Sequence, residues 1–459
     1  MKQNSPLILV IPLLLLAVLC GCTSSSGKSG NIEGENGETA KSPEDLQFVF
    51  KDQQYSFEAL RAMSQSVVGG ADIGECLSTI YRIKDGDDES WYREWLRTAQ
   101  RVEKMAQGFL DQGDRISAKE CYTRASNYYR TAEFFLHTDP KDPRIIETWR
   151  KSRDCFLEVV SLSDGLIEPV EIPFEGITLP GYFYLVDKSK AVRPLLLIQT
   201  GFDGTGEEIC IQIASVAVKR GFNCLVFEGP GQGRVIREQH IPFRPNWETV
   251  VTPVVDFALE RPEVDPEKIA LMGISFGGYF APRAVAFEHR IKICIANGGV
   301  YDFHASMMQN MPPNFEQMLD DKETAAEIDE QIYQTMKTNP KLRWTFGNGM
   351  FTFDSKSPSD WIRATRPYNM RDSADKIKCR MLVIDSENDK GLPGQAKQLY
   401  DALSCPKEFM LFTAEEGAGE HCQVGGYMIS NERILNWLER TFSKESRTAT
   451  KIADQSLNN

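Results

Sequence analysis

The chain has 459 residues, which is enough for two or three domains, each with its own hydrophobic core. Its proportions of apolar and charged residues are ordinary for a globular protein and exclude a mainly disordered chain. A formal net charge of −13 argues against nucleic acid or an anionic membrane surface as a partner, because like charges repel.

The first residues predict an export signal. An apolar run at residues 7–19 is too short to cross a bilayer comfortably. The sequence LCGC at residues 19–22 resembles a bacterial lipobox, which predicts lipidation of Cys22; a simple secretory signal cut nearby is the alternative. We therefore expect a lipoprotein-type signal over residues 1–22 and a polar flexible tether over residues 23–43. The globular part would then lie outside the cytoplasm, held at the cell-envelope membrane by the lipid alone.

The eleven cysteines do not form a disulfide framework. Apart from Cys20 and Cys22 they are scattered, with no C-x-x-C pair and no spacing typical of metal ligands. We therefore expect neither a metal nor a cofactor. Free thiols are in tension with export to an oxidising compartment, and a reducing or anoxic habitat would reconcile the two.

Residues 44–165 predict a small helical domain. Apolar side chains recur at helical spacing within residues 88–111 and 116–136, and a third helix begins near Asp142 and Pro143. The aromatic residues of this segment are better explained as core than as a ligand surface. A peptide-binding helical repeat is the sharper alternative.

Residues 166–443 change to strands that alternate with helices. After a hairpin at residues 170–186, this rhythm predicts an α/β fold with a mostly parallel, doubly wound sheet. The expected strands are 194–200, 223–227, 268–272, 291–296, 381–385 and 409–412, and the expected helices are 207–221, 247–260, 395–403 and 431–442. Residues 301–368 interrupt the rhythm and predict a lid-like helical insertion over the strand ends. Residues 444–459 predict a frayed polar tail.

The segment KIALMGISFGGYFA, residues 268–281, has the pattern of a nucleophile elbow. A buried strand leads into a tight turn that carries Ser275, and a helix-compatible run follows. The turn requires small residues two positions before and after the serine, and Gly273 and Gly277 stand there. A chance match is the alternative, but the strand and helix around the motif favour a functional serine.

A serine hydroxyl needs a base before it can act as a nucleophile. The chain has five histidines, namely His137, His240, His289, His304 and His421. In strand–elbow–helix hydrolases the order along the chain is serine, acid, histidine. His421 fits this order, because it follows the last strand in a glycine-bracketed loop and precedes the final helix. His289 and His304 also follow the serine but lie too close to it in sequence.

The acid that orients the histidine should follow the strand at residues 381–385. Asp385, Glu387 and Asp389 are the candidates. Asp385 still lies on the strand, and the acid is expected three residues beyond the turn at Ser386, which favours Asp389. A carboxylate there would accept the second N–H of the imidazole and stabilise the imidazolium.

An oxyanion hole needs two backbone N–H groups. The residue after the nucleophile, Phe276, supplies one, and we expect Phe202, in the loop after the strand at 194–200, to supply the other. The segment FEGPGQG, residues 227–233, contains G-x-G but no downstream lysine. It predicts a tight loop beside the active site rather than a phosphate-binding loop.

Five segments together resemble one branch of the α/β-hydrolases: FEGPGQG, GISFGGYFAPRAVA, LVIDSENDKGLPGQAKQLYDAL, FTAEEGAGEHCQVGG and RASNYYRTAEFFL. That branch includes esterases like the fermentation–respiration switch protein, 2,6-dihydropseudooxynicotine hydrolase and fungal polyketide-shortening hydrolases. The resemblance covers about residues 45–442 and implies that Ser275, Asp389 and His421 form a catalytic triad. It also implies that the helical domain caps the active site and contributes to dimers in many members. Members cleave esters or carbon–carbon bonds next to a ketone.

We therefore expect a serine hydrolase of the α/β-hydrolase fold that acts on a small acyl or ketone substrate through an acyl-enzyme on Ser275. A homodimer is consistent with the resemblance. A dipeptidyl-aminopeptidase-like peptidase is an alternative, although the chain lacks a β-propeller segment and an acidic amine-binding motif. A catalytically inert, membrane-tethered binding protein and an envelope scaffold acting through the helical domain are further alternatives.

Overall fold

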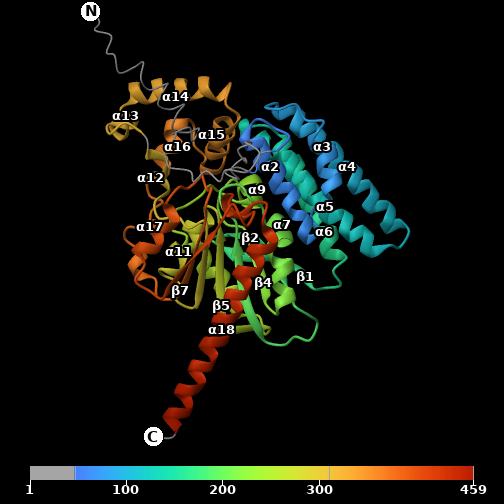
Figure 1. Cartoon of the computed structure of the whole chain (residues 1–459), viewed down its shortest axis with the longest axis vertical. Coiled ribbons are helices and arrows are strands. Elements are labelled where there is room, and N and C mark those ends of the chain that lie inside the picture. Colours follow the sequence, from blue (N-terminus) through green and yellow to red (C-terminus); the bar gives the residue numbers. More distant parts are fainter. Residues whose placement is uncertain (1–45, 47, 310, 458–459) are drawn as a thin grey trace, which may run out of the picture.

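The computed structural model describes residues 46, 48–309 and 311–457, and a single eight-stranded sheet forms its centre (Figure 1). The strands are β1 (Ile167–Phe174), β2 (Ile177–Tyr184), β3 (Arg193–Gln199), β4 (Asn223–Phe227), β5 (Val264–Ile274), β6 (Ile293–Asn297), β7 (Arg380–Ser386) and β8 (Lys407–Phe412). Their spatial order is β1-β2-β4-β3-β5-β6-β7-β8. Strand β2 pairs antiparallel with β1 and with β4, and all other neighbours are parallel. The predicted doubly wound, mostly parallel sheet is confirmed.

Both faces of the sheet are buried. Successive side chains of a strand point to opposite faces, so Leu196 and Ile198 of β3 enter one core while Leu195 and Leu197 enter the other. The first core is covered by a helical run made of α7 (Gly206–Ile209), the π-helical turn η4 (Cys210–Ala214), α8 (Ser215–Ala217) and η5 (Val218–Arg220), and by α18 (Tyr427–Leu457). The second is covered by α10 (Glu248–Leu259), α11 (Gly277–Val285) and α17 (Gln395–Ala402). Two helical layers therefore enclose the sheet.

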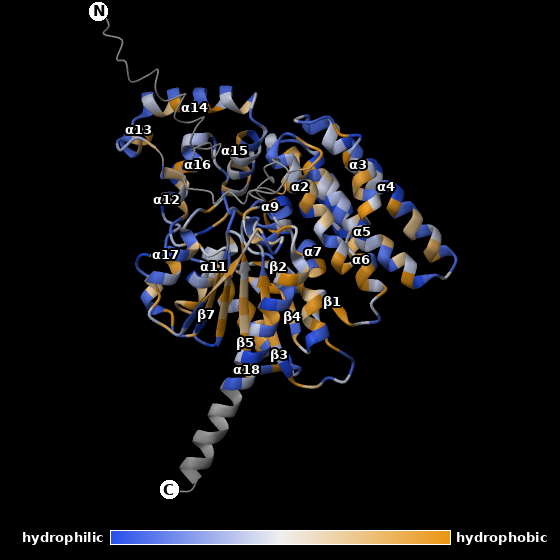
Figure 2. Cartoon of the chain, in the orientation of Figure 1, coloured by the Kyte–Doolittle hydropathy of each residue, from blue (hydrophilic) through white to orange (hydrophobic). Residues whose placement is uncertain are grey.

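The N-terminal part is helical, and it packs beside the sheet (Figure 1). Its helices are α2 (Gln53–Ser64), η2 (Gln65–Val68), α3 (Ile73–Ile80), α4 (Asp88–Asp111), α5 (Arg115–Glu133), η3 (Phe134–Thr138) and α6 (Arg144–Ser161). The rings of Trp91, Trp95 and Tyr128 are fully buried and contact one another in sequence order. The interpretation of the aromatic residues as core is therefore confirmed, and Figure 2 shows apolar and polar residues on different sides of these helices.

A helical insertion follows β6 and gathers at one end of the sheet, next to α2 (Figure 1). Its helices are α12 (Phe303–Met308), α13 (Phe315–Asp320), α14 (Lys322–Met336), α15 (Pro340–Phe353) and α16 (Pro358–Ala364). Arg343 of α15 binds Asp88 of α4 at 2.7 Å, and the rings of Trp344 and Phe134 stack at 4.4 Å. These contacts join the insertion to the helical domain.

The structure differs from the sequence prediction at the C-terminus. Helix α18 continues to Leu457, through the residues expected to form a frayed tail, because no glycine or proline interrupts the chain after Phe442. The helix expected at residues 207–221 contains the π-helical turn η4 instead of one regular α-helix. All nine cysteines of the described residues are free.

The predicted signal at residues 1–22, the tether at 23–43 and the lipidation site Cys22 lie outside the described residues. Lipidation, export and homodimerisation therefore stay predictions. No helix in the described part of the chain is long and apolar enough to cross a membrane.

Candidate active site

Ser275 stands between the end of β5 and the start of α11, which is the predicted elbow. Its φ of 61° lies in the left-handed region, which a non-glycine residue adopts only where the surroundings hold it there. The Ser275 N–H donates to the Asn297 carbonyl at 2.8 Å, and its own carbonyl accepts from the Gly278 N–H at 2.7 Å. The first bond ties the strained turn to the end of the neighbouring strand β6, and the second closes the turn itself.

The two glycines of the motif are required by packing. A Cβ on Gly273 would lie 1.9 Å from the Gly277 carbonyl oxygen, and a Cβ on Gly277 would lie 2.8 Å from the Thr200 carbonyl oxygen. Both contacts involve backbone atoms, which have little room to move. Any larger residue would open the turn and move Ser275 away from the strand end.

The structure brings together the three residues that the sequence singled out. The Nε2 atom of His421 lies 2.8 Å from the Ser275 Oγ, and its Nδ1 atom lies 2.6 Å from an Asp389 carboxylate oxygen. Asp389 follows β7, and His421 begins the 3-10 turn η7 (His421–Gln423) after β8. The His421 side chain is 25% exposed and the Asp389 side chain is 4% exposed, so the imidazole is accessible while its carboxylate partner is shielded.

Asp389 is held by its own loop. Its second carboxylate oxygen accepts the Gly391 N–H at 2.9 Å and the Leu392 N–H at 3.1 Å. Burial raises the pKa of Asp389, but His421 and these N–H groups outweigh burial and hold it below its usual value. For His421 burial disfavours the charged form, yet the Asp389 carboxylate outweighs it and raises the pKa well above that of a free histidine. The pair is therefore electrostatically matched to an imidazolium.

The two rejected acids have other partners. Asp385 accepts the Ser386 N–H at 3.0 Å, and burial raises its pKa. Glu387 accepts the Ala414 N–H at 2.8 Å. Of the three candidate acids, Asp389 is the one that the structure places in hydrogen-bond contact with His421.

The sequence did not predict the hydrogen bonds that hold the loop of His421 in place. Cys422 and Gln423 have left-handed φ angles of 52° and 59°. The Gln423 side chain exchanges two hydrogen bonds of 2.9 Å with the side-chain amide of Asn297. The backbone carbonyl of Asn297 accepts the Ser275 N–H. This amide pair ties the histidine loop to the elbow. The only sequence signal was the position of Gln423 two residues after His421.

The two expected oxyanion donors belong to adjoining loops. A Cβ built on Gly201 would lie 2.5 Å from the Phe276 nitrogen, so the loop after β3 runs directly against the elbow. Within the described residues, the N–H groups of Phe202 and Phe276 donate to no other group. Both remain available to a bound oxygen atom.

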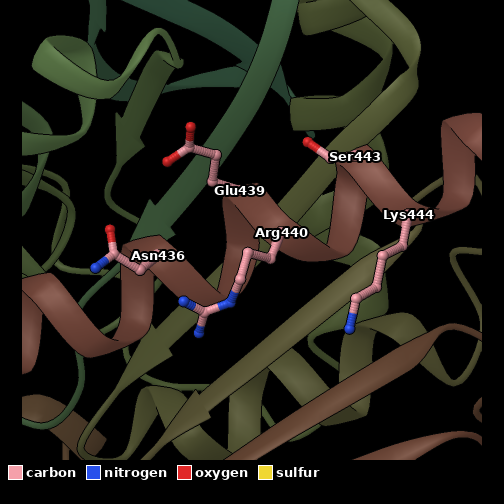
Figure 3. A pocket seen from close by; sticks show the side chains of 5 residues that line it. All are labelled: Asn436, Glu439, Arg440, Ser443 and Lys444. Atoms are coloured by element: carbon pink, nitrogen blue, oxygen red, sulfur yellow. The ribbon is translucent and has the colours of Figure 1, made fainter.

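Aromatic side chains from the insertion surround these loops. The Phe202 ring lies 6.0 Å from Trp344 and 6.0 Å from Trp361, and the Phe276 ring lies 4.3 Å from Phe303. The surface hollow of Figure 3 lies instead along α18, lined by Asn436, Glu439, Arg440, Ser443 and Lys444. Among the described residues, no group of three histidine, cysteine, aspartate or glutamate side chains is arranged to hold a metal ion.

Comparisons with known proteins identify the family of the chain. The model of the prolyl oligopeptidase family matches residues 212–346. The hydrolase acrC of Aspergillus aculeatus is 33% identical over 414 residues, which cover 84% of this chain and 96% of acrC. The 20-hydroxy-prefusarin hydrolase FUS2 of Gibberella moniliformis is 33% identical over 411 residues, covering 86% of this chain and 98% of FUS2.

Among solved structures, the crystal structure of 2,6-dihydroxy-pseudo-oxynicotine hydrolase matches with a TM-score of 0.65. It is 18% identical, and the match covers 82% of this chain and 95% of that chain, which shows a shared fold. The identity to acrC and FUS2 extends over nearly the whole length of both relatives. The chain is therefore a hydrolase of the α/β-hydrolase family, in the branch that includes these fungal enzymes.

Proposed function

We propose that this hydrolase forms an acyl-enzyme on Ser275 and cleaves a carboxylic ester or a carbon–carbon bond next to a ketone. The observation that carries the proposal is the His421 imidazole, which bonds Ser275 Oγ at 2.8 Å and Asp389 at 2.6 Å. Activating a serine hydroxyl requires a base that is hydrogen-bonded to it and an acid that orients the base.

The mechanism follows from the bonds of the imidazole. Because Nδ1–H donates to Asp389, the Nε2 lone pair faces Ser275 and can take the hydroxyl proton as Oγ attacks the substrate carbonyl. The N–H groups of Phe202 and Phe276 then stabilise the negative oxygen of the tetrahedral intermediate. His421 returns its proton to the leaving group, which departs and leaves the acyl chain on Ser275.

Water completes the cycle. His421 takes a proton from a water molecule, which attacks the acyl carbonyl, and Ser275 leaves with the proton returned by His421. In an ester the leaving group is an alkoxide. In a carbon–carbon cleavage it is a carbanion, which needs an adjacent carbonyl or an electron-rich aryl group to carry the charge. The name of FUS2 as a 20-hydroxy-prefusarin hydrolase supports a small organic substrate here.

A peptidase is the second candidate, because the prolyl oligopeptidase family model matches residues 212–346. That match includes Ser275 but ends before Asp389 and His421. The same triad could serve amide hydrolysis, so the choice depends on the substrate.

The test is hydrolysis by the full-length chain of three panels: p-nitrophenyl esters of increasing acyl length, β-diketones and aminoacyl p-nitroanilides. We expect turnover of the esters or diketones, and no turnover by the Ser275→Ala variant. Turnover of the anilides alone would favour the peptidase. A folded wild-type chain no faster than Ser275→Ala on all three panels would contradict the proposal.

A further inference from the structure

The loop that carries Phe202 is held through its carbonyl groups. The Gln232 side chain, from the FEGPGQG segment, donates to the Thr200 carbonyl at 2.7 Å and to the Gly201 carbonyl at 3.4 Å. The Phe202 carbonyl accepts a bond of 3.1 Å from the side-chain Nδ2 of Asn348. In a trans peptide the N–H points away from the preceding carbonyl, so fixing the Gly201 carbonyl directs the Phe202 N–H. Three successive peptide units are therefore oriented by two side-chain amides.

Asn348 lies in α15 of the insertion and is fully buried. Its Nδ2 faces a carbonyl oxygen, which accepts hydrogen bonds only, so its Oδ1 must be the atom that faces His137. The His137 Nδ1 lies 2.6 Å from that oxygen and therefore donates. The Phe202 carbonyl and the His137 N–H therefore hold the Asn348 amide in one orientation.

His137 is itself held in place. Its Nε2 lies 3.4 Å from Arg237 Nη2, which can donate to it, and 3.0 Å from the Glu133 carboxylate, which accepts a bond of 2.7 Å from Arg237 Nε. Glu133 and His137 belong to the helical domain, Arg237 to α9 (Gly233–Gln239) and Asn348 to the insertion. All four side chains are buried. The chain of contacts therefore exists only when these three parts of the molecule are docked.

A second arm reaches the next residue of the loop. Arg61 of α2 binds the Asp203 carboxylate at 2.6 Å and both Glu208 oxygens at 2.7 Å. Asp203 directly follows Phe202, so the helical domain holds the loop next to the residue that carries the oxyanion donor, while Gln232 holds it on the other side.

We propose that Asn348, oriented by His137, is a positioning residue for the oxyanion hole. It fixes the peptide unit after Phe202, while Gln232 fixes the unit that carries the Phe202 N–H, and the two together hold that N–H toward the carbonyl attacked by Ser275. The helical domain and the insertion thereby contribute to stabilising the transition state. This inference rests on the proposed serine mechanism.

The first test is Asn348→Asp in the full-length chain. A carboxylate has the size of the amide but cannot donate to the Phe202 carbonyl, which it repels instead. We expect kcat for the best ester to fall about 10²-fold, the scale of losing one oxyanion donor, with KM nearly unchanged. Affinity for a boronic acid, which mimics the tetrahedral intermediate, should fall by a similar factor. Affinity for an amide isostere of the ester, which mimics the bound substrate, should stay unchanged.

Asn223→Asp is the matched control. Asn223 is also buried, its Nδ2 donates to the Glu263 carbonyl at 3.1 Å and its Oδ1 accepts the Val186 N–H at 3.0 Å. It begins β4, at the end of the strand away from the site. Asn223→Asp should therefore lower stability without selectively lowering boronate affinity.

His137 supplies a second pair of variants. His137→Asn keeps an N–H at the position of the histidine Nδ1, from which it can donate to Asn348, whereas His137→Leu cannot donate. The asparagine variant should therefore retain more kcat and boronate affinity at equal KM. Wild-type kcat and boronate affinity in Asn348→Asp, or equal values in the two His137 variants, would overturn this inference alone. A wild-type chain that neither hydrolyses esters nor reacts at Ser275 would overturn the proposed function and this inference with it.

Discussion

At the scale of single residues, the environment distinguishes one aspartate from its neighbour four positions earlier. Asp389 accepts two backbone N–H groups and the His421 imidazole, so its pKa is held down despite burial. Asp385 has one backbone N–H, and burial raises its pKa. A carboxylate that must stay ionised beside an imidazolium needs the first environment.

Asp389→Asn should lower kcat/KM about 10⁴-fold, because the amide can no longer hold the imidazole in the tautomer that leaves Nε2 free. The acidic limb of the pH profile should also move to lower pH. Only neutral His421 acts as the base, and Asp389 is what raises the pKa of His421, so its removal lets the histidine lose its proton earlier. The measurement is kcat/KM against pH.

Asp385→Asn is the matched control and should keep both the rate and the position of the acidic limb near wild type. If Asp385→Asn abolished activity while Asp389→Asn kept it, the assignment of the acid would be wrong.

At the scale of elements, the site is formed where two parallel strands end side by side. Strands β3 and β5 are neighbours, so the loop after β3 meets the elbow after β5. Gly201 marks the contact, because a Cβ there would lie 2.5 Å from the Phe276 nitrogen and 2.7 Å from the Ile274 oxygen. The spacing between the two oxyanion donors depends on this missing side chain.

Gly201→Ala should therefore push the loop after β3 away from the elbow and lower kcat about 10²-fold, with a smaller change in KM. Gly108→Ala is the control, since a Cβ at this α4 position meets nothing within 4 Å. It should leave kcat unchanged and raise the melting temperature slightly, because alanine favours a helix over glycine. Equal kcat in Gly201→Ala and wild type would contradict the tight contact.

The elements that sequence could predict are those set by local pattern. Strand β5, the glycines of the elbow and the order of Ser275, Asp389 and His421 follow from short motifs and the parallel topology. The bond between His137 and Asn348 joins residues 211 positions apart and depends on how the insertion docks, which no local pattern encodes. The Gln423–Asn297 amide pair is hidden for the same reason.

At the scale of the whole molecule, the helical and catalytic parts are joined by a buried cluster of charges. Glu58, Asp203 and Glu208 lie around Arg61 and Arg130, which leaves one carboxylate in excess. Burial opposes ionisation of Asp203 and Glu208, but the arginines outweigh it and lower their pKa values. Burial dominates at Glu58 and raises its pKa to about 7.

The raised pKa of Glu58 makes the stability of the fold depend on pH. Between its usual pKa of 4.5 and about 7, Glu58 binds a proton more tightly in the folded than in the unfolded chain. Its favourable contribution is therefore complete below pH 4.5 and is lost as pH rises to about 7. Burial and the nearby Glu207 raise the pKa of Glu228 to about 7 as well, and the raised pKa of His421 acts in the same direction at higher pH.

We therefore expect the free energy of unfolding to decline as pH rises from about 5 to 8, and Glu58→Gln to remove part of that decline. Relative to wild type, the variant should gain up to about 3 kcal/mol across this window, because each pKa unit is worth about 1.4 kcal/mol. Urea unfolding at several pH values measures it.

The control is Glu147→Gln at an exposed position in α6, which should keep the wild-type slope. Parallel pH dependence in Glu58→Gln and wild type would show that Glu58 does not bind this proton.

Mass spectrometry after treatment with a fluorophosphonate shows whether Ser275 is an activated nucleophile. The full-length wild-type chain should gain one adduct, mapped to Ser275. The adduct should be absent from Ser275→Ala and form far more slowly in His421→Ala. A folded wild-type chain without an adduct, or an adduct that persists in Ser275→Ala, would show that Ser275 is not the activated nucleophile.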